Sequence, residues 1–159
     1  ECGLDYFRME KDSKEEQMEI FKRQIELSIE INKPLMLHIR NAYEDSLSVL
    51  KQYPKAKGNV HFFAGDYEIA KKFIDIGFTL SFTGVITFAD SYDEVIKNIP
   101  LNMIMSETDC PFVSPIPYRG KRNEPSYVKE VKRIAEIRKE DIDIVKRALV
   151  DNAIRVFDF

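Results

Sequence analysis

Two carboxylates, Glu107 and Asp109, stand directly after the apolar run at residues 101–105 and are separated by one residue. An apolar run of this length suits a strand buried on both faces, and its acidic end would meet solvent at the edge of the sheet. Carboxylates are costly to desolvate. They occur at such a strand end either as solvated turn residues or because a cation binds there. Asp109 is therefore a candidate ligand for a metal ion.

The two histidines of the sequence, His38 and His61, each lie near the end of an apolar run that a loop follows. Neutral imidazole nitrogens bind Zn, Mn, Fe or Ni, and two added carboxylates make a mixed site for one or two divalent ions. Glu1 is the candidate for a carboxylate that bridges two metals, which lie about 3.5–4 Å apart in such sites. The alternatives are strand-end histidines bonded to backbone groups and, for Glu1, a terminal residue without fixed geometry.

A basic segment at residues 115–125 follows the acidic strand end. Its three cationic residues are Arg119, Lys121 and Arg122. Guanidinium groups pair bidentately with phosphate oxygens, so the segment is a candidate phosphate-binding loop, with a solvated basic loop as the alternative. Arg40 lies two residues after His38 and would face the same side of a strand. It is the fourth candidate for phosphate binding.

The remaining aromatic and thiol side chains are expected mostly to pack. The aromatics expected in the core are Phe62, Phe63, Phe78, Phe82 and Phe88, and those better suited to stacking on bases are Tyr6, Phe7 and Tyr118. Cys2 and Cys110 lie far apart and form neither a metal-spaced pair nor a disulfide framework, so both are expected to be reduced and packed. A reducing compartment, the cytoplasm, fits this cysteine content.

The elements that must position these residues alternate between apolar runs and amphipathic stretches. The end of one strand is expected within residues 1–8. Four further strands are expected at residues 35–39, 59–63, 78–82 and 101–105. Helices are expected at residues 13–31, 43–53, 66–76, 91–99 and from residue 125 onward, with a last helix around residues 144–149. Capping boxes mark two helix starts, Ser13 with Glu16 and Ser91 with Glu94.

Strand and helix alternation with short connections predicts an α/β fold with a parallel sheet covered by helices. An open doubly wound sheet binds its ligand at one switch point, whereas a closed barrel gathers residues from many strand ends. The candidate site residues come from four strand ends, namely Glu1 or Asp5, His38, His61 and Asp109. This favours a TIM (β/α)8 barrel. A full barrel takes about 250 residues, so only about the last five strand–helix units are expected in this chain.

The composition limits the class of protein and its partners. The chain has 159 residues, is 44% hydrophobic and carries a net charge of −3, which predicts a single soluble domain over residues 1–159. No apolar run approaches the roughly 20 residues needed to cross a bilayer, so no membrane partner is expected. Nucleic-acid contact would depend on a local basic patch. The chain begins with Glu1 inside an apparent motif, so the native N-terminus is expected to be absent.

Six segments carry a resemblance to a known family. They are residues 1–6 (ECGLDY), 37–40 (LHIR), 61–65 (HFFAG), 81–84 (SFTG), 106–111 (SETDCP) and 119–125 (RGKRNEP). Together they resemble the TatD family of metal-dependent deoxyribonucleases, in the amidohydrolase-like group of barrels, over nearly the whole chain. The resemblance implies that Glu1 bridges two metals, that His38 and His61 are ligands to one of them, and that Asp109 is a ligand and possible base. The family's first strand, with its His-x-His pair, and the two units after it have no counterpart here.

The leading hypothesis is a hydrolase that cleaves phosphodiester bonds of DNA at strand ends. It would use two divalent metal ions, with Mg, Mn and Zn as the candidates, and a metal-activated water. Asp109 and Glu1 would be the catalytic residues. An alternative is hydrolysis of an ester or amide by the same metal-activated water. A third possibility is an inactive fragment that needs its N-terminal portion. The full-length protein is expected to be a monomer with DNA as its partner.

Overall fold

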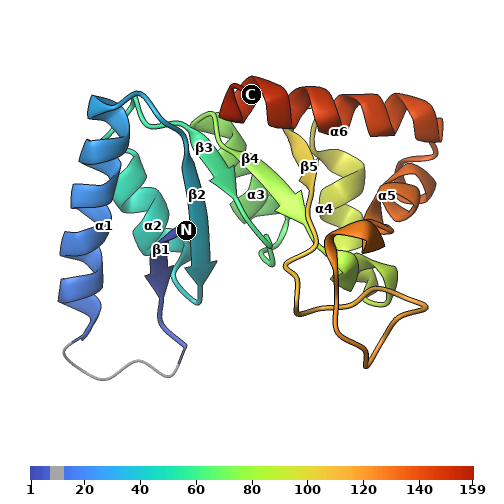
Figure 1. Cartoon of the computed structure of the whole chain (residues 1–159). Coiled ribbons are helices and arrows are strands. Elements are labelled where there is room, and N and C mark those ends of the chain that lie inside the picture. The colour runs from blue at the N-terminus through green and yellow to red at the C-terminus, as the bar shows by residue number, and fades with distance from the viewer. Residues whose placement is uncertain (8–12) are drawn as a thin grey trace.

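The computed structural model describes residues 1–7 and 13–159, and its centre is a sheet of parallel strands in sequence order. The strands are β1 (Cys2–Asp5), β2 (Leu35–Arg40), β3 (Gly58–Val60), β4 (Thr79–Phe82) and β5 (Ile104–Ser106). Each strand pairs with the next, and every pairing is parallel. The predicted parallel α/β architecture with five strands is confirmed (Figure 1).

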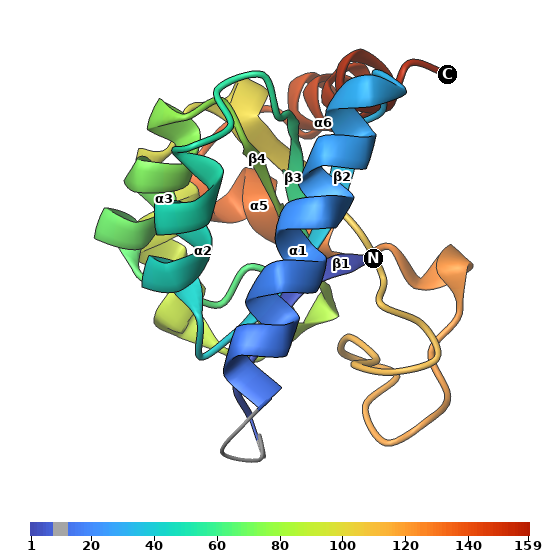
Figure 2. The same cartoon turned by 90° about the vertical axis from the view of Figure 1, so that its left-hand side faces the viewer.

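Four of the helices connect successive strands, the last two follow β5, and all lie along the outside of the sheet (Figures 1 and 2). They are α1 (Ser13–Glu30), α2 (Tyr43–Leu50), α3 (Tyr67–Asp75), α4 (Asp93–Asn98), α5 (Glu130–Arg138) and α6 (Ile142–Phe157). Helix α6 crosses the end of the sheet where the strands begin. Its Asn152 side chain donates there to the carbonyl of Ile104, the first residue of β5, at 2.7 Å. The carboxyl ends of the strands are left free for a site. No helix in the described part of the chain is long and apolar enough to cross a membrane.

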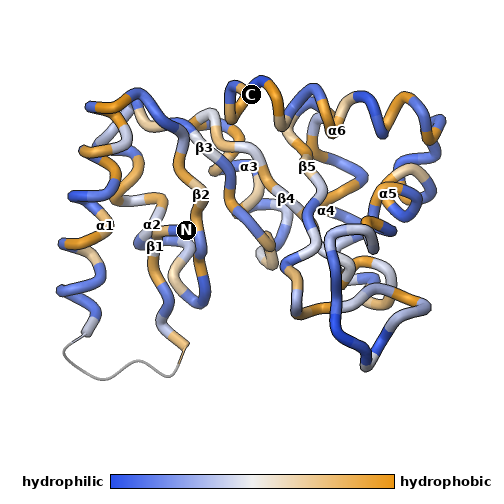
Figure 3. The backbone as a smooth tube through the Cα atoms, viewed as in Figure 1, coloured by the Kyte–Doolittle hydropathy of each residue, from blue (hydrophilic) through white to orange (hydrophobic). Residues whose placement is uncertain are grey.

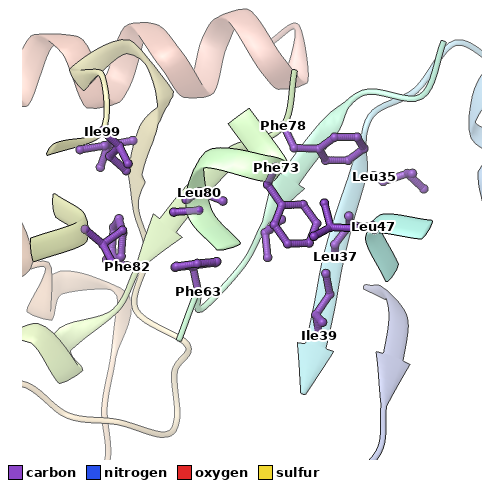
Figure 4. Close-up of a cluster of buried hydrophobic side chains, with 14 of the residues drawn as sticks. Leu35, Leu37, Ile39, Leu47, Phe63, Phe73, Phe78, Leu80, Phe82 and Ile99 are labelled. Atoms are coloured by element: carbon purple, nitrogen blue, oxygen red, sulfur yellow. The ribbon is translucent and has the colours of Figure 1, made fainter. Parts of the chain in front are cut away.

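Strand β2 shows how alternation separates the core from the site. Leu35, Leu37 and Ile39 are buried, whereas His38 and Arg40 point to the other face of the strand. Figure 4 shows the buried side, where Leu47 of α2 lies beside Leu37. Alternating hydrophobic and hydrophilic bands along α1 and α6 in Figure 3 mark the helix faces. His38 and Arg40 therefore share one face, as the sequence predicts.

Three expected elements differ from the structure. Strand β3 ends at Val60, because the backbone turns at Phe62, whose φ is +43°. Residues 90–92 form a short 3₁₀ turn, η2 (Asp90–Tyr92), so α4 begins at Asp93 without a cap from Ser91. Residues 125–127 form another 3₁₀ turn, η4 (Pro125–Tyr127), and α5 begins only at Glu130. The start of α1 at residue 13 agrees with the prediction, although the residue before it lies outside the described part.

Three expectations of burial are wrong. Phe62 is half-buried and lines a cavity rather than the core, because the backbone turns at this residue. Phe88 is 37% exposed, because it follows the 3₁₀ turn η1 (Gly84–Thr87) and its ring lies under the Arg119 guanidinium at 3.7 Å. Cys110 is also exposed, because the chain leaves the sheet beyond Ser106 and enters a long loop. Cys2 is half-buried, and burial raises the pKa of its thiol. Both thiols are free, as expected.

Candidate metal centre

The close pairing of β1 with β2 brings two carboxylates around His38. Gly3 pairs with His38, and Asp5 pairs with Arg40. The φ of Gly3 is +138°, and a Cβ at this position would lie 2.1 Å from the His38 carbonyl oxygen. Only glycine allows the two strands to approach so closely. Glu1, just before the strand, and Asp5, at its end, thereby reach the same histidine region.

Three side chains place atoms that can bind a metal ion close to one another. Glu1, His38 and His61 each offer one ligand atom, and these atoms all lie within 4.8 Å of one another. Nδ1 of His38 is 3.2 Å from Nε2 of His61, and that nitrogen is 3.6 Å from a Glu1 carboxylate oxygen. One carboxylate and two imidazoles form a donor set suited to a divalent transition metal or Zn.

A carboxylate stands behind each imidazole. Nε2 of His38 is 3.0 Å from Asp5 Oδ2, and Nδ1 of His61 is 3.5 Å from Glu107 Oε2. When these outer nitrogens carry the protons, the two inner nitrogens face each other with lone pairs. A cation held by His38 and His61 would relieve this opposition, and carboxylate–histidine pairs orient metal ligands in the same way. The residues present therefore fit a divalent ion.

The pKa values reflect the negative charge of the centre. Burial acts to lower the pKa of His61, but the hydrogen bond and charge of Glu107, with the charges of Glu1 and Asp109, outweigh it and raise the pKa. Burial raises the pKa of Asp109, with help from the nearby Glu107 and Glu1. For Asp5, hydrogen bonds from Phe7 and His38 overcome its slight burial and lower the pKa. A bound cation would offset this accumulated charge.

Glu107 also belongs to the candidate site, although it is not among the site residues expected from the sequence. One of its oxygens accepts a hydrogen bond from the Phe62 N–H, and the other faces His61. Its side chain is 20% exposed. The available signal was its spacing of two residues from Asp109, because alternate residues of an extended chain share a face.

Asp109 reaches the centre but is not among the three clustered ligands. It adopts a left-handed backbone with a φ of +53°, and it lines the same cavity as Glu1 and both histidines. The buried Asn123 holds the turn around it, since its Nδ2 donates to the carbonyls of Thr108 and Phe112 at 2.8 and 2.7 Å. The structure thus places Asp109 beside the metal ligands rather than within their cluster.

A cavity of about 490 Å³ opens over this centre. Its lining residues are Glu1, His38, Ile39, Arg40, His61, Phe62, Ala64, Tyr92 and Asp109. The volume falls within the roughly 300–1,000 Å³ of typical small-ligand sites. All four predicted metal-site residues share it.

The predicted phosphate-binding cations are divided between two places. Arg40 lines the cavity, and its guanidinium lies 3.6 Å from the centre of the Phe7 ring. Arg119, Lys121 and Arg122 are exposed, and none is among the described residues that line the cavity. Their loop packs against η1 instead, where the Ile116 N–H donates to the Thr87 hydroxyl at 3.0 Å. The structure does not bring these three cations to the metal centre.

The whole described site lies in a chain that matches one family model, "TatD related DNase", over residues 1–158. The chain belongs to this family. It is 43% identical over 162 residues to the "Uncharacterized metal-dependent hydrolase YabD" of Bacillus subtilis, covering 99% of this chain and 63% of that protein. It is 39% identical over 138 residues to a "Putative deoxyribonuclease TATDN1 homolog" of Enterocytozoon bieneusi, covering 80% of this chain and 48% of that one.

A solved TatD homologue supports the barrel assignment. The crystal structure of YjjV from Escherichia coli K12 superposes with a TM-score of 0.92 and 27% identity, covering 100% of this chain and 62% of that chain. The fold is therefore that of the TatD barrels, as predicted. The chain spans about three fifths of the length of YabD and of the YjjV chain, and about half of the length of the Enterocytozoon bieneusi protein.

Proposed function

We propose that the protein is a divalent-metal-dependent hydrolase that cleaves phosphodiester bonds of DNA at strand ends. The observation that carries the proposal is the cluster of Glu1, His38 and His61, with a carboxylate behind each histidine. The relatives' names support the same chemistry, since one is called a metal-dependent hydrolase and another a putative deoxyribonuclease.

The roles of the side chains follow from their positions. Glu1, His38 and His61 would hold a divalent ion, and Glu1 with Asp109 would serve a second one. Mg, Mn and Zn are the candidate metals. A bound ion supplies Lewis-acid polarisation of the phosphoryl group and lowers the pKa of water. Asp109 would accept the proton of the attacking water, because its carboxylate belongs to the same cavity as the three clustered ligands.

Arg40 is the side chain best placed to hold the substrate phosphate in the cavity. Its guanidinium lies over the Phe7 ring, which restricts its orientation before any ligand arrives. The exposed Arg119, Lys121 and Arg122 would contact phosphates farther along the strand. Because such contacts release counterions, DNA affinity should fall with rising salt at saturating metal. An affinity that is independent of salt would rule out these phosphate contacts.

Hydrolysis of an ester or amide is the second candidate. The observation that favours it is that Arg40 is the only one of the four predicted phosphate-binding cations among the described lining residues. A single guanidinium also suits a carboxylate-bearing acyl substrate. Preferential turnover of acyl substrates over oligonucleotides would therefore reverse the assignment.

The deciding experiment is release of nucleotides from an end-labelled single-stranded oligonucleotide. Cleavage is expected with Mg, Mn or Zn, and it should stop when a chelator removes the metal. The variant His61→Ala should be inactive, which excludes a contaminating nuclease. Calorimetric titration with Mn²⁺ gives a second readout, because the same variant should lose metal affinity whether or not DNA is cleaved. Cleavage that is unchanged by the chelator or by His61→Ala would overturn the proposal.

A further inference from the structure

Aromatic side chains form one part of the cavity wall that the metal chemistry does not use. Phe62 and Tyr92 line the cavity together with Ala64. Ala64 and Tyr92 also line an adjoining groove of about 240 Å³ with Gly65, Asp66 and Ser91. The cavity and the groove therefore share a boundary at Ala64 and Tyr92.

Both aromatic rings are fixed from behind. Glu107 accepts a hydrogen bond from the Phe62 N–H, and the Phe62 ring meets the His61 ring edge to face at 6.4 Å. The Tyr92 ring meets the Phe82 ring at 6.4 Å and 86°. Phe82 is fully buried and packs against Phe63, as Figure 4 shows. Rings held in this way lose little conformational entropy when a flat ligand stacks on them.

The charges around the cavity differ from one part to another. Arg40 is the cation in the lining, whereas Phe62, Ala64 and Tyr92 carry no charge. Burial raises the pKa of Tyr92, so its hydroxyl stays protonated at neutral pH. The groove beyond contains the carboxylate of Asp66, which accepts from the Ile69 N–H at 2.9 Å and would repel a phosphate. The aromatic part therefore suits a flat, uncharged group, and the part at Arg40 suits a phosphate.

We propose that Phe62, Ala64 and Tyr92 form a nucleobase subsite, which holds the base of the terminal nucleotide while Arg40 holds its phosphate. This inference rests on the proposed function, because it states how the terminal nucleotide is oriented in the same cavity. Bases stack on aromatic rings with little regard to sequence. The subsite therefore favours a terminal nucleotide with a base over one without, but it does not select a particular base.

Ala64 lines both the cavity and the groove. Its backbone N–H donates to the Tyr43 hydroxyl at 2.9 Å, which fixes its position. Its methyl group occupies little of the space between the two. A larger side chain at this position would fill the space that the base needs.

The subsite can be tested by binding of 2-aminopurine deoxyribonucleoside 5′-monophosphate, whose fluorescence is quenched when its base stacks. The chain should quench it, and the variants Tyr92→Ala and Ala64→Leu should bind about tenfold more weakly. Tyr92→Phe should bind nearly as well as the parent chain, because the ring remains. Tyr127→Ala is the matched control, since this ring stacks on Tyr118 at 3.8 Å outside the cavity lining. Circular dichroism checks that each variant folds.

This binding assay separates the subsite from the proposed nuclease activity. Quenching that depends on Tyr92 supports the subsite even if no DNA is cleaved. Where DNA is cleaved, the parent chain should disfavour an oligonucleotide with an abasic terminal residue, and Tyr92→Ala should lose that preference. Equal affinity of Tyr92→Ala and the parent chain, or an absence of quenching by the parent chain, would overturn the subsite while leaving the nuclease proposal standing.

Discussion

Each histidine of the candidate metal centre has a carboxylate on the side of its ring that faces away from the other histidine. Glu107 both faces His61 and accepts the Phe62 N–H, so it determines which nitrogen of His61 is free. Asp5 does the same for His38. At this scale the chemistry is set by pairs of residues rather than by single ligands.

The variant Glu107→Gln should weaken metal binding while leaving the chain folded. Glutamine keeps the shape of the side chain but loses the charge that favours a proton on the outer nitrogen of His61. Loss of such a partner typically costs about 10–100-fold in metal affinity. Titration with Mn²⁺ measures the effect. Glu136→Gln, an exposed carboxylate on α5, is the control and should bind as the parent chain does. Equal affinity of the two variants would contradict the role given to Glu107.

Glu130 should make the stability of the chain depend on pH. It is fully buried, and burial raises its pKa from 4.5 to about 7, although backbone N–H groups at the start of α5 favour the charged form. Below about pH 4.5 the carboxyl is protonated in both states, and its full stability is present. Between about pH 4.5 and 7 the unfolded chain releases this proton while the folded chain retains it, so the free energy of unfolding falls.

The expected loss attributable to Glu130 is on the order of 3 kcal/mol between pH 4.5 and 7, with no further change above that range. Urea unfolding at pH 4 and pH 8 measures it. The variant Glu130→Gln should remove most of this difference and should be the more stable protein at pH 8. Glu94→Gln, on the exposed start of α4, is the control. A pH dependence of the same size in Glu130→Gln and the parent chain would show that other groups cause it.

Elements whose residues pack locally were predictable from the sequence. The burial of Leu35, Leu37 and Ile39 follows directly from their alternation in β2. The exposure of Phe88 and the late start of α5 did not follow from any local pattern. Both depend on how the loop after β5 folds back onto η1, which is a contact between segments far apart in sequence. Glu107 was missed for the same reason, since its partners His61 and Phe62 lie on another element.

The loop that carries Asp109 should lose both stability and activity in the variant Asn123→Ala. Asn123 is buried, and its amide closes the turn by donating to two carbonyls. Leaving those carbonyls unpaired typically costs about 1–3 kcal/mol. Asp109 would then no longer be held beside the metal ligands, so kcat should fall more than KM rises. Thermal unfolding and steady-state kinetics measure the two effects.

Asn98→Ala is the matched control for the Asn123 variant. The Asn98 amide also donates to a backbone carbonyl, that of Glu94, but it is exposed. Its loss should change the free energy of unfolding by no more than about 0.5 kcal/mol and leave kcat unaltered. If Asn123→Ala behaved in the same way, the turn around Asp109 would not depend on this amide.

The pairing of β1 with β2 should fail in the variant Gly3→Ala. The added Cβ would lie 2.1 Å from the His38 carbonyl oxygen, so the strands must separate and Glu1 must move away from the histidines. Gly120→Ala tests the backbone strain alone, because its φ is also positive, at +79°, and a Cβ there meets nothing within 4 Å. Strain of this kind costs about 1–3 kcal/mol. Mn²⁺ affinity should fall in Gly3→Ala only, and an equal fall in both would contradict this explanation.

On the scale of the whole molecule, the sheet ends in two edges. Among the described residues, β1 pairs only with β2 and β5 only with β4. Next to the β1 edge, α1 exposes Ile20 and Leu27, and the turn after it exposes Ile31, each by more than half of its surface. Open strand edges and exposed apolar stripes favour association with further strands and helices. YabD and the YjjV chain are both longer than this chain, which covers 63% and 62% of their lengths.

Strands and helices that cover these two edges should therefore raise the proposed activity when they are supplied. The part of Bacillus subtilis YabD outside the matched region is the natural source, and the expected complex contains one copy of each segment. Covered edges would stabilise the cavity that β1, β2 and β3 form, so phosphodiesterase activity should rise at least about tenfold, and self-association of the chain should fall. A YabD segment with prolines in its edge strands, which cannot pair with β1 or β5, should have neither effect. Full activity without any added segment would instead mean that the five strands hold Glu1, His38 and His61 in working geometry by themselves.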